Sequence, residues 1–106
     1  MVTTRRFGVI VSYDCKSNRT RKKIIDTCFD YGMDRIQYSV FSGALKPAQY
    51  KELINVLKLM INYKDPMSIF IQKVPISSIS DFHLYEYDER SIHRFNIYEK
   101  KRNFFD

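Results

Sequence analysis

The chain has 106 residues, of which 44% are hydrophobic, and a formal net charge of +6. This length fits one ordinary domain and excludes two, and the lack of any apolar run of about 18 residues excludes a membrane-spanning helix. The two cysteines, Cys15 and Cys28, have neither metal-ligand spacing nor the pattern of a disulfide framework, so we expect a cytoplasmic protein.

The excess positive charge lies near the start of the chain. Residues 1–23 hold seven Lys and Arg but one acid, Asp14, whereas the remaining residues hold eleven of each sign. Such a group of cations around one turn is typical of a surface that binds phosphate backbones, and a solvated helix end is the plainer alternative. We therefore expect nucleic acid as the partner and no membrane.

The first elements predicted along the chain are a strand and a helix. Residues 7–13 are apolar on both faces and rich in β-branched side chains, which is typical of a buried central strand. A helix is predicted over residues 19–31, with Ser17 or Asn18 as its cap. Gly32 suits the left-handed position after the helix ends.

Two strands and a second helix are predicted next. Residues 35–41 alternate like one strand, and Gly43 permits a bend after it. Pro47 suits a helix start, and apolar residues then repeat at helical spacing as far as about residue 62. Residues 68–74 predict another strand.

This order of elements predicts an α+β fold, the ferredoxin-like βαββαβ sandwich, in which two helices cover a sheet. That fold needs two strands between the helices, and no hairpin signal separates them in the sequence. We therefore expect one long strand that is split near Ser42 and Gly43.

The chain carries no linker that would mark a second domain. We expect residues 1–80 to form the ferredoxin-like core and residues 81–106 to form a C-terminal extension of the same single domain. Short strands are predicted in this extension at 82–87 and 92–98.

Asp14 is the first candidate for chemistry. It follows the first strand, where α/β sheets tend to place ligand sites, and it is the only acid among seven basic residues. A carboxylate in such surroundings is useful when it holds Mg²⁺ or Mn²⁺, which bridge to phosphate, although a turn-forming or helix-capping role also explains it. One carboxylate rarely holds a metal, so the metal hypothesis requires a two-fold dimer that supplies two.

Three stretches of the chain resemble CRISPR-associated protein 2, the small partner of the spacer-acquisition integrase. Residues 9–14 with the basic stretch 19–23 resemble the family's first strand, terminal Asp and basic helix start. Residues 31–43 are similar to the family's most specific signature, and residues 45–49 resemble the start of its second helix. The likeness covers about residues 7–74.

This resemblance implies a ferredoxin-like protomer, a stable homodimer, and an extra C-terminal strand within 82–98 that pairs across the dimer. It implies a role in CRISPR adaptation, in which the dimer bridges integrase subunits and helps hold the DNA that becomes a new spacer. It also implies that Asp14 of both protomers flanks a divalent metal, usually Mg²⁺, because metal-dependent cleavage of single-stranded RNA or double-stranded DNA occurs in some members.

The resemblance also assigns roles to residues. Asp14 is the catalytic and metal-binding residue, and Ser39 and Phe41 shape the site. The nucleic-acid-binding residues that we expect are Lys16, Arg19, Arg21, Lys22, Lys23 and Arg35. Many members carry further acids in the loop that is 15–18 here, and this loop has none, so a second metal ligand from it is absent.

Three hypotheses of function follow. In the first, the chain is a DNA-binding scaffold of the adaptation complex. In the second, it is a Mg²⁺-dependent endonuclease that acts on RNA or double-stranded DNA, and its activity is either used in the cell or silent there. In the third, the chain is a small ribonuclease toxin or a plain RNA-binding ferredoxin-like module. The resemblance to the CRISPR-associated family over residues 35–43 argues against this third hypothesis.

Overall fold

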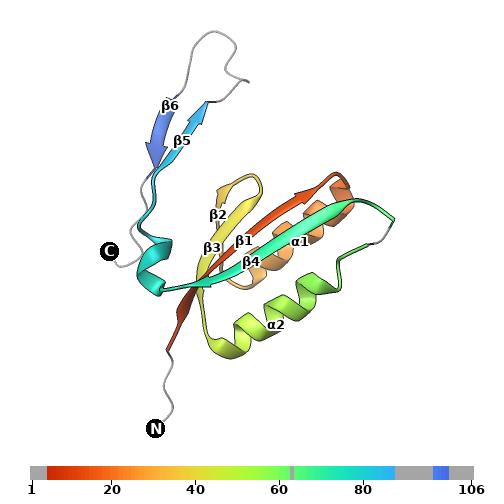
Figure 1. The fold of residues 1–106 in the computed structure, drawn as a ribbon, viewed down its shortest axis with the longest axis horizontal. Helices are drawn as coiled ribbons and strands as arrows, with labels where there is room; N and C mark the ends of the chain where they lie inside the picture. The colour runs from red at the N-terminus through yellow and green to blue at the C-terminus, as the bar shows by residue number, and fades with distance from the viewer. Residues whose placement is uncertain (1–4, 63, 88–96, 101–106) are drawn as a thin grey trace.

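The computed structural model describes residues 5–62, 64–87 and 97–100 (Figure 1). The core elements are β1 (Phe7–Cys15), α1 (Asn18–Asp30), β2 (Asp34–Gln37), β3 (Val40–Leu45), α2 (Pro47–Lys58) and β4 (Met67–Val74). They are followed by the 3₁₀ helix η1 (Ile76–Ile79) and the strands β5 (Leu84–Tyr87) and β6 (Ile97–Lys100). The order βαββαβ confirms the predicted α+β, ferredoxin-like fold.

The core sheet has the strand order β2-β3-β1-β4, and every neighbouring pair is antiparallel. The two helices lie together on one side of this sheet, whereas η1 packs across one end of the other side (Figure 1). β1 lies in the interior of the sheet, as its apolar sequence predicts.

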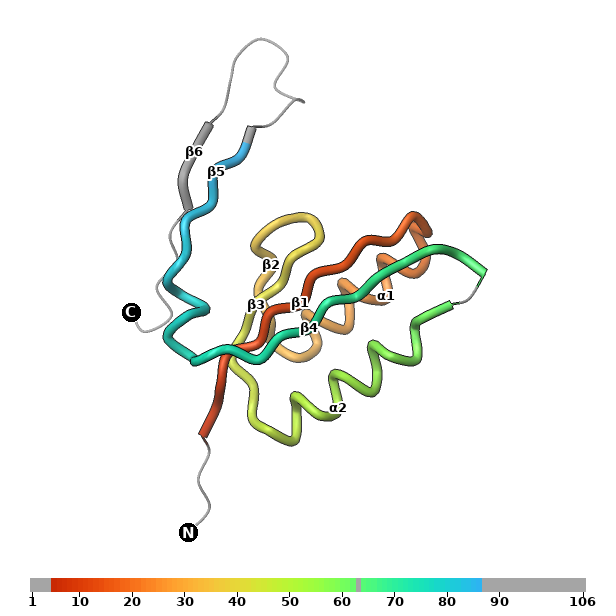
Figure 2. The backbone as a smooth tube through the Cα atoms, in the orientation of Figure 1, coloured from red at the N-terminus to blue at the C-terminus, as the bar shows by residue number. Residues whose placement is uncertain are grey.

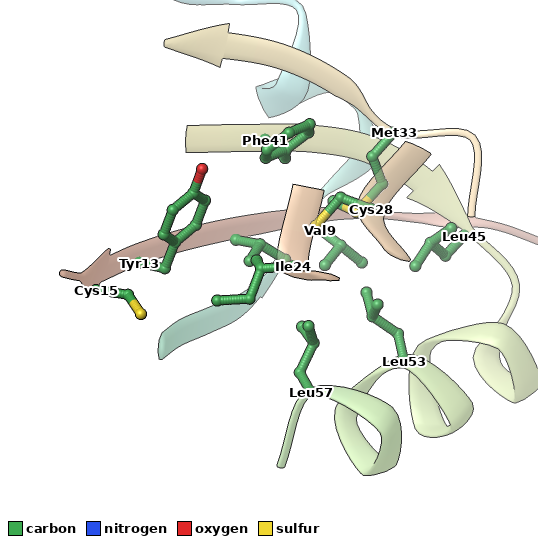
Figure 3. Close-up of a cluster of buried hydrophobic side chains, with 11 residues drawn as sticks. Val9, Tyr13, Cys15, Ile24, Cys28, Met33, Phe41, Leu45, Leu53 and Leu57 are labelled. Carbon is green, nitrogen blue, oxygen red and sulfur yellow. The ribbon is translucent and has the colours of Figure 1, made fainter. Parts of the chain in front are cut away.

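The core lies between the sheet and the two helices (Figure 3). Val9 and Val11 of β1 are fully buried, because alternate residues of a strand face the same side. They pack in one cluster with Ile24 of α1, Phe41 of β3 and Leu53 of α2, all of which are also fully buried.

The junction between β2 and β3 differs from the prediction. The chain turns at Tyr38 and Ser39, so the expected split near Ser42 and Gly43 is wrong. Those two residues lie inside β3, in register with β1. Gly43 serves close packing rather than a bend, because a Cβ there would lie 3.0 Å from the Met33 side chain.

The ends of the helices follow local rules. The Ser17 hydroxyl accepts a hydrogen bond from the Thr20 backbone N–H at 3.3 Å and caps α1, and Gly32 has the left-handed φ of 75° after it. α2 ends at Lys58, earlier than the predicted residue 62. No described helix has both the length and the apolar character needed to cross a membrane.

The C-terminal extension forms a second, two-stranded sheet in which β5 and β6 are antiparallel (Figure 1). β5 lies apart from the four strands of the core sheet (Figure 2). β5 lies within the predicted strand at 82–87. β6 begins at residue 97, so the strand predicted at 92–98 is displaced, and its first part lies outside the described residues. The domain division at residue 80 stays a prediction.

Candidate nucleic-acid and metal site

A pocket of about 370 Å³ lies at the carboxyl end of β1. Four of the predicted site residues line it: Asp14, Arg21, Arg35 and Ser39. They come from β1, α1, β2 and the turn between β2 and β3, so the fold brings together residues that are far apart in the sequence. Four more residues line this site, which we call the Asp14 pocket: Tyr13, Cys15, Ile25 and Tyr38.

The turn beside Asp14 is held by side chains from two strands. The Tyr13 hydroxyl donates a hydrogen bond to the Tyr38 carbonyl oxygen at 2.7 Å, and Arg35 donates to the same oxygen from Nε at 3.1 Å and Nη2 at 2.7 Å. The Tyr13 backbone N–H also donates to the Ser39 carbonyl at 3.1 Å. These bonds fix the turn next to the end of β1.

Burial raises the pKa of Tyr13, against the opposing effect of the Arg35 charge. Tyr13 therefore stays protonated at neutral pH and remains a hydrogen-bond donor. Its role was not predicted from the sequence, since a strand aromatic next to Asp14 gives no local sign that its hydroxyl will meet a distant turn.

Arg35 also packs against aromatic rings. Its guanidinium carbon lies 5.4 Å from the Tyr38 ring centroid and 5.9 Å from the Phe41 ring centroid, which is cation–π geometry. Phe41 is fully buried and does not line the Asp14 pocket, so its ring is not accessible to a base, and its role in shaping the site stays a prediction. Tyr38 is 64% exposed and remains open to such contact.

The remaining predicted cations lie around the start of α1. Lys16, Arg19, Lys22 and Lys23 are exposed, whereas Arg21 is half-buried against the Asp14 pocket. Lys22 forms an exposed ion pair with Asp26 at 2.8 Å, so its charge is partly offset. We therefore rank it below its neighbours as a phosphate ligand.

The cations of residues 1–23 do not surround one turn. Arg5 and Arg6 precede β1, and the other five follow it. β1 has nine residues and is extended, so about 30 Å separate the two groups. The expectation that all seven cations lie around one turn is therefore wrong, because an extended strand separates its two ends.

Asp14 is exposed and belongs to the sheet face that lacks the helices, where its register partner is Ser68. The described residues contain no group of three His, Cys, Asp or Glu side chains that could hold a metal ion. One described protomer therefore offers Mg²⁺ or Mn²⁺ a single carboxylate, and the metal hypothesis fits these residues only with a second protomer.

The cysteines are poor candidates for ligands or nucleophiles. Both are buried and free, and burial raises the pKa of Cys28 to about 12. His83 stacks on the Tyr85 ring with centroids 6.5 Å apart, and it lies outside the lining of the Asp14 pocket.

Comparison with known proteins identifies the family. The family model described as CRISPR associated protein Cas2 matches residues 8–81. The chain is 44% identical over 50 residues to "CRISPR-associated endoribonuclease Cas2 2" of Pyrobaculum aerophilum, a match that covers 47% of this chain and 55% of that protein. A second relative of the same name, from Chloroflexus aurantiacus, is 43% identical over 44 residues, which cover 42% of this chain and 52% of that one.

A longer relative joins two proteins in one chain. It is the "CRISPR-associated endonuclease Cas1/endonuclease Cas2 fusion" of Thermoproteus tenax, 49% identical over 45 residues, which cover 42% of this chain and 17% of the fusion. The chain spans about half the length of the first two relatives.

Solved structures agree with the family. The fold is similar to Cas2 of Streptococcus pyogenes, with a TM-score of 0.54 and 27% identity over 61% of this chain and 82% of that one. A second structure, titled "Crystal structure of cas2", gives a TM-score of 0.61 and 27% identity over 85% of this chain and 98% of that one. With the family model matched over residues 8–81, the chain belongs to the Cas2 family of CRISPR-associated proteins.

Proposed function

We propose that the chain acts in CRISPR adaptation as a homodimer that binds nucleic acid, and that Asp14 supports divalent-metal-dependent phosphodiester hydrolysis. The observation that carries this proposal is the Asp14 pocket, which Asp14, Arg21 and Arg35 line together. The exposed cations at the start of α1 continue the same surface. Cations attract the phosphate backbone, and a carboxylate among them serves a metal-bridged phosphate.

The sheet face without helices supports a homodimer. Phe70 of β4 is 56% exposed on this face, and its neighbours Ser68 and Gln72 are exposed as well. A large aromatic ring on an open sheet is typical of a surface that packs against a second copy. Because Asp14 belongs to the same face, a two-fold axis there would bring the two carboxylates toward each other.

The edge of the sheet offers the second dimer contact. β4 is an outer strand of the described sheet, so its free edge can pair with a further strand. We propose that a strand from residues 82–98 of the partner occupies this edge, as the extra C-terminal strand predicted to cross the dimer.

The proposed hydrolysis of phosphodiester bonds involves few residues of each protomer. A bound Mg²⁺ or Mn²⁺ supplies Lewis acidity and a template for attack by water on the phosphate. Asp14 of each protomer holds it, Arg21 and Arg35 bind the phosphates on either side, and the fixed turn presents Ser39 to the substrate. The endoribonuclease names of two relatives support RNA as the substrate class, with double-stranded DNA as the alternative.

A second candidate function is a scaffold without catalysis. The loop 15–18 carries no acid, and the described residues contain no group of three or more His, Cys, Asp or Glu side chains that could hold a metal ion, which favours DNA binding over cleavage. The Cas1/Cas2 fusion supports a CRISPR-associated protein 1 integrase as the partner of such a scaffold. Membership of the Cas2 family argues against a ribonuclease toxin or a plain RNA-binding module.

Cleavage assays separate the two candidates. Wild type, Asp14→Asn and the exposed control Asp30→Asn are incubated with labelled single-stranded RNA and duplex DNA, with Mg²⁺ or with chelator. We expect wild type and Asp30→Asn to cleave only with metal and Asp14→Asn to be inactive. Equal cleavage by all three would remove Asp14 from the mechanism, and no cleavage with intact, salt-sensitive DNA binding would establish the scaffold.

A further inference from the structure

A second, larger pocket of about 920 Å³ lies at the opposite end of β1 from Asp14. It is formed where the start of β1, the end of β4 and the first turns of α2 meet (Figure 1). None of the residues assigned above to nucleic-acid binding or catalysis lines this pocket. We call it the Phe7 pocket.

The walls of the Phe7 pocket are apolar and aromatic. The rings of Phe7 and Tyr50 pack edge to face with centroids 5.1 Å apart, and Ile54 and Val74 extend this surface. Lys73 Nζ lies 5.0 Å from the Phe7 ring centroid, so one cation is already seated on an aromatic wall. The pocket therefore offers contact area to a flat or apolar group.

The rim of the same pocket is positively charged. Arg5, Arg6, Lys51 and Lys73 line it, all four are exposed, and no acid is found among its described lining residues. The first turn of α2, which also lines the pocket, contains no acid either, so the partial positive charge of the helix start adds to the same field. Four cations without a counter-charge select for a ligand with several negative charges.

We propose that the Phe7 pocket binds single-stranded nucleic acid, with phosphates on the basic rim and bases against the aromatic walls. This inference rests on the proposed function in so far as nucleic acid is the ligand, and it adds a separate footprint. Proteins that bind single strands combine a basic groove with aromatic side chains, because every base has a ring face and every linkage a phosphate. A duplex keeps its bases stacked inside, so it uses the rim alone.

The distance between the Phe7 pocket and the cations of α1 determines how long a nucleic acid must be to contact both. About 30 Å of β1 separate its rim from the cations at the start of α1. A short single strand reaches one group, whereas a longer one contacts both. The pocket therefore adds affinity for long single strands more than for short duplexes.

The test uses the full chain and two variants that remove equal positive charge. Arg6→Gln/Lys51→Gln alters the rim of the Phe7 pocket, and Lys58→Gln/Lys64→Gln alters exposed lysines outside both pockets. Binding of fluorescent oligo(dT) and of a duplex is measured against salt, and circular dichroism verifies folding. We expect the rim variant to bind oligo(dT) about tenfold more weakly, with a salt slope lower by about 1.4 for two lost phosphate contacts.

A second measurement identifies where the single-stranded nucleic acid binds. Photo-crosslinking of iodouracil-substituted oligo(dU) to wild type should modify peptides that contain Phe7 or Tyr50. If the rim variant matches the control variant in oligo(dT) affinity and slope, or if crosslinks fall only near Asp14, the inference is wrong. Loss of poly-glutamate binding with unchanged oligo(dT) binding would also overturn it, because the occupant would then be an acidic polypeptide.

A third variant separates this inference from the proposed function. Arg19→Gln/Arg21→Gln alters the cations at the start of α1 and should weaken duplex binding in particular. If wild type binds no nucleic acid with salt sensitivity, both proposals fail together. If Arg19→Gln/Arg21→Gln loses duplex binding while the rim variant behaves as the control, the proposed function stands and the Phe7 pocket is excluded.

Discussion

The two faces of the sheet are completed in different ways. On the helix-covered face, Val11, Phe41 and Leu53 are fully buried within one chain. On the other face, Phe70 is 56% exposed, whereas η1 and the segment after it, as far as Leu84, cover one end of the described sheet. The first face therefore holds the main buried cluster of the protomer, whereas part of the second stays exposed, and Asp14 belongs to the second.

The largest expected effect lies on the covered face. Leu53→Ala removes a fully buried side chain between the helices and the sheet, and it should lower the free energy of unfolding by about 2–5 kcal/mol. Leu59→Ala is the matched control, because Leu59 is 85% exposed and should change stability by less than about 0.5 kcal/mol. Urea denaturation of both variants measures the contrast, and equal losses would mean that the covered face is not the source of stability.

A smaller effect is expected where η1 meets the open face. A Cβ at Gly8 would lie 2.5 Å from Ile79 Cγ2 and 2.8 Å from Val74 Cγ2. Gly8→Ala should therefore cost about 1–3 kcal/mol of stability, because η1 has to shift away from the sheet. In Gly8→Ala/Ile79→Ala the crowding against Ile79 is relieved while that against Val74 remains, so the double variant should lose less than the sum of the two single variants. Strict additivity would show that the close approach carries no energy.

The open face should respond in assembly rather than in folding. Phe70→Glu places a charge on the surface that we propose as the dimer contact, and it should weaken the dimer at least about tenfold. Gln72→Glu adds the same charge on the same strand without removing an aromatic ring, and we expect it to have less effect. Sedimentation at several protein concentrations measures both, and a dimer that survives Phe70→Glu unchanged must use another surface.

Sequence periodicity predicted the covered face well. β1, α1 and α2 each bury apolar side chains at regular spacing, and β4 partly buries its own, and the predicted positions of all four agree with the structure to within a few residues. Ser17 and Gly32 were predicted because a helix cap and a left-handed residue obey local rules. These features depend on residues that are close in sequence, so they can be predicted from the sequence alone.

The turn between β2 and β3 could not be predicted in the same way. Tyr38 is not a favoured turn residue, and Ser39 alone is a weak turn signal. The turn is held by the Tyr13 hydroxyl from another strand and by Arg35. The Asp14 pocket has the same origin: Asp14, Arg21 and Arg35 were each predicted singly, but their meeting depends on tertiary packing. Arg5 was placed with the wrong group because sequence distance ignores the length of a strand.

The smallest expected effect is the pH dependence of stability that comes from the buried thiol of Cys28. Burial raises the pKa of Cys28 to about 12, above the usual thiol pKa of about 8.5, so the unfolded chain ionises first as pH rises. The stability that Cys28 contributes is complete below the usual pKa and is lost as pH rises toward the folded value. Wild type should therefore lose roughly 1 kcal/mol between pH 9 and pH 10 from this residue alone.

Cys28→Ala should remove this part of the alkaline loss, whatever it does to stability at neutral pH. Cys15→Ala retains Cys28 and should keep its contribution, so the difference in slope between the two variants isolates one buried thiol. Urea denaturation at a series of alkaline pH values measures both slopes. If they are equal, water reaches Cys28, and the covered face is less completely closed than the packing of Ile24 and Phe41 around that thiol indicates.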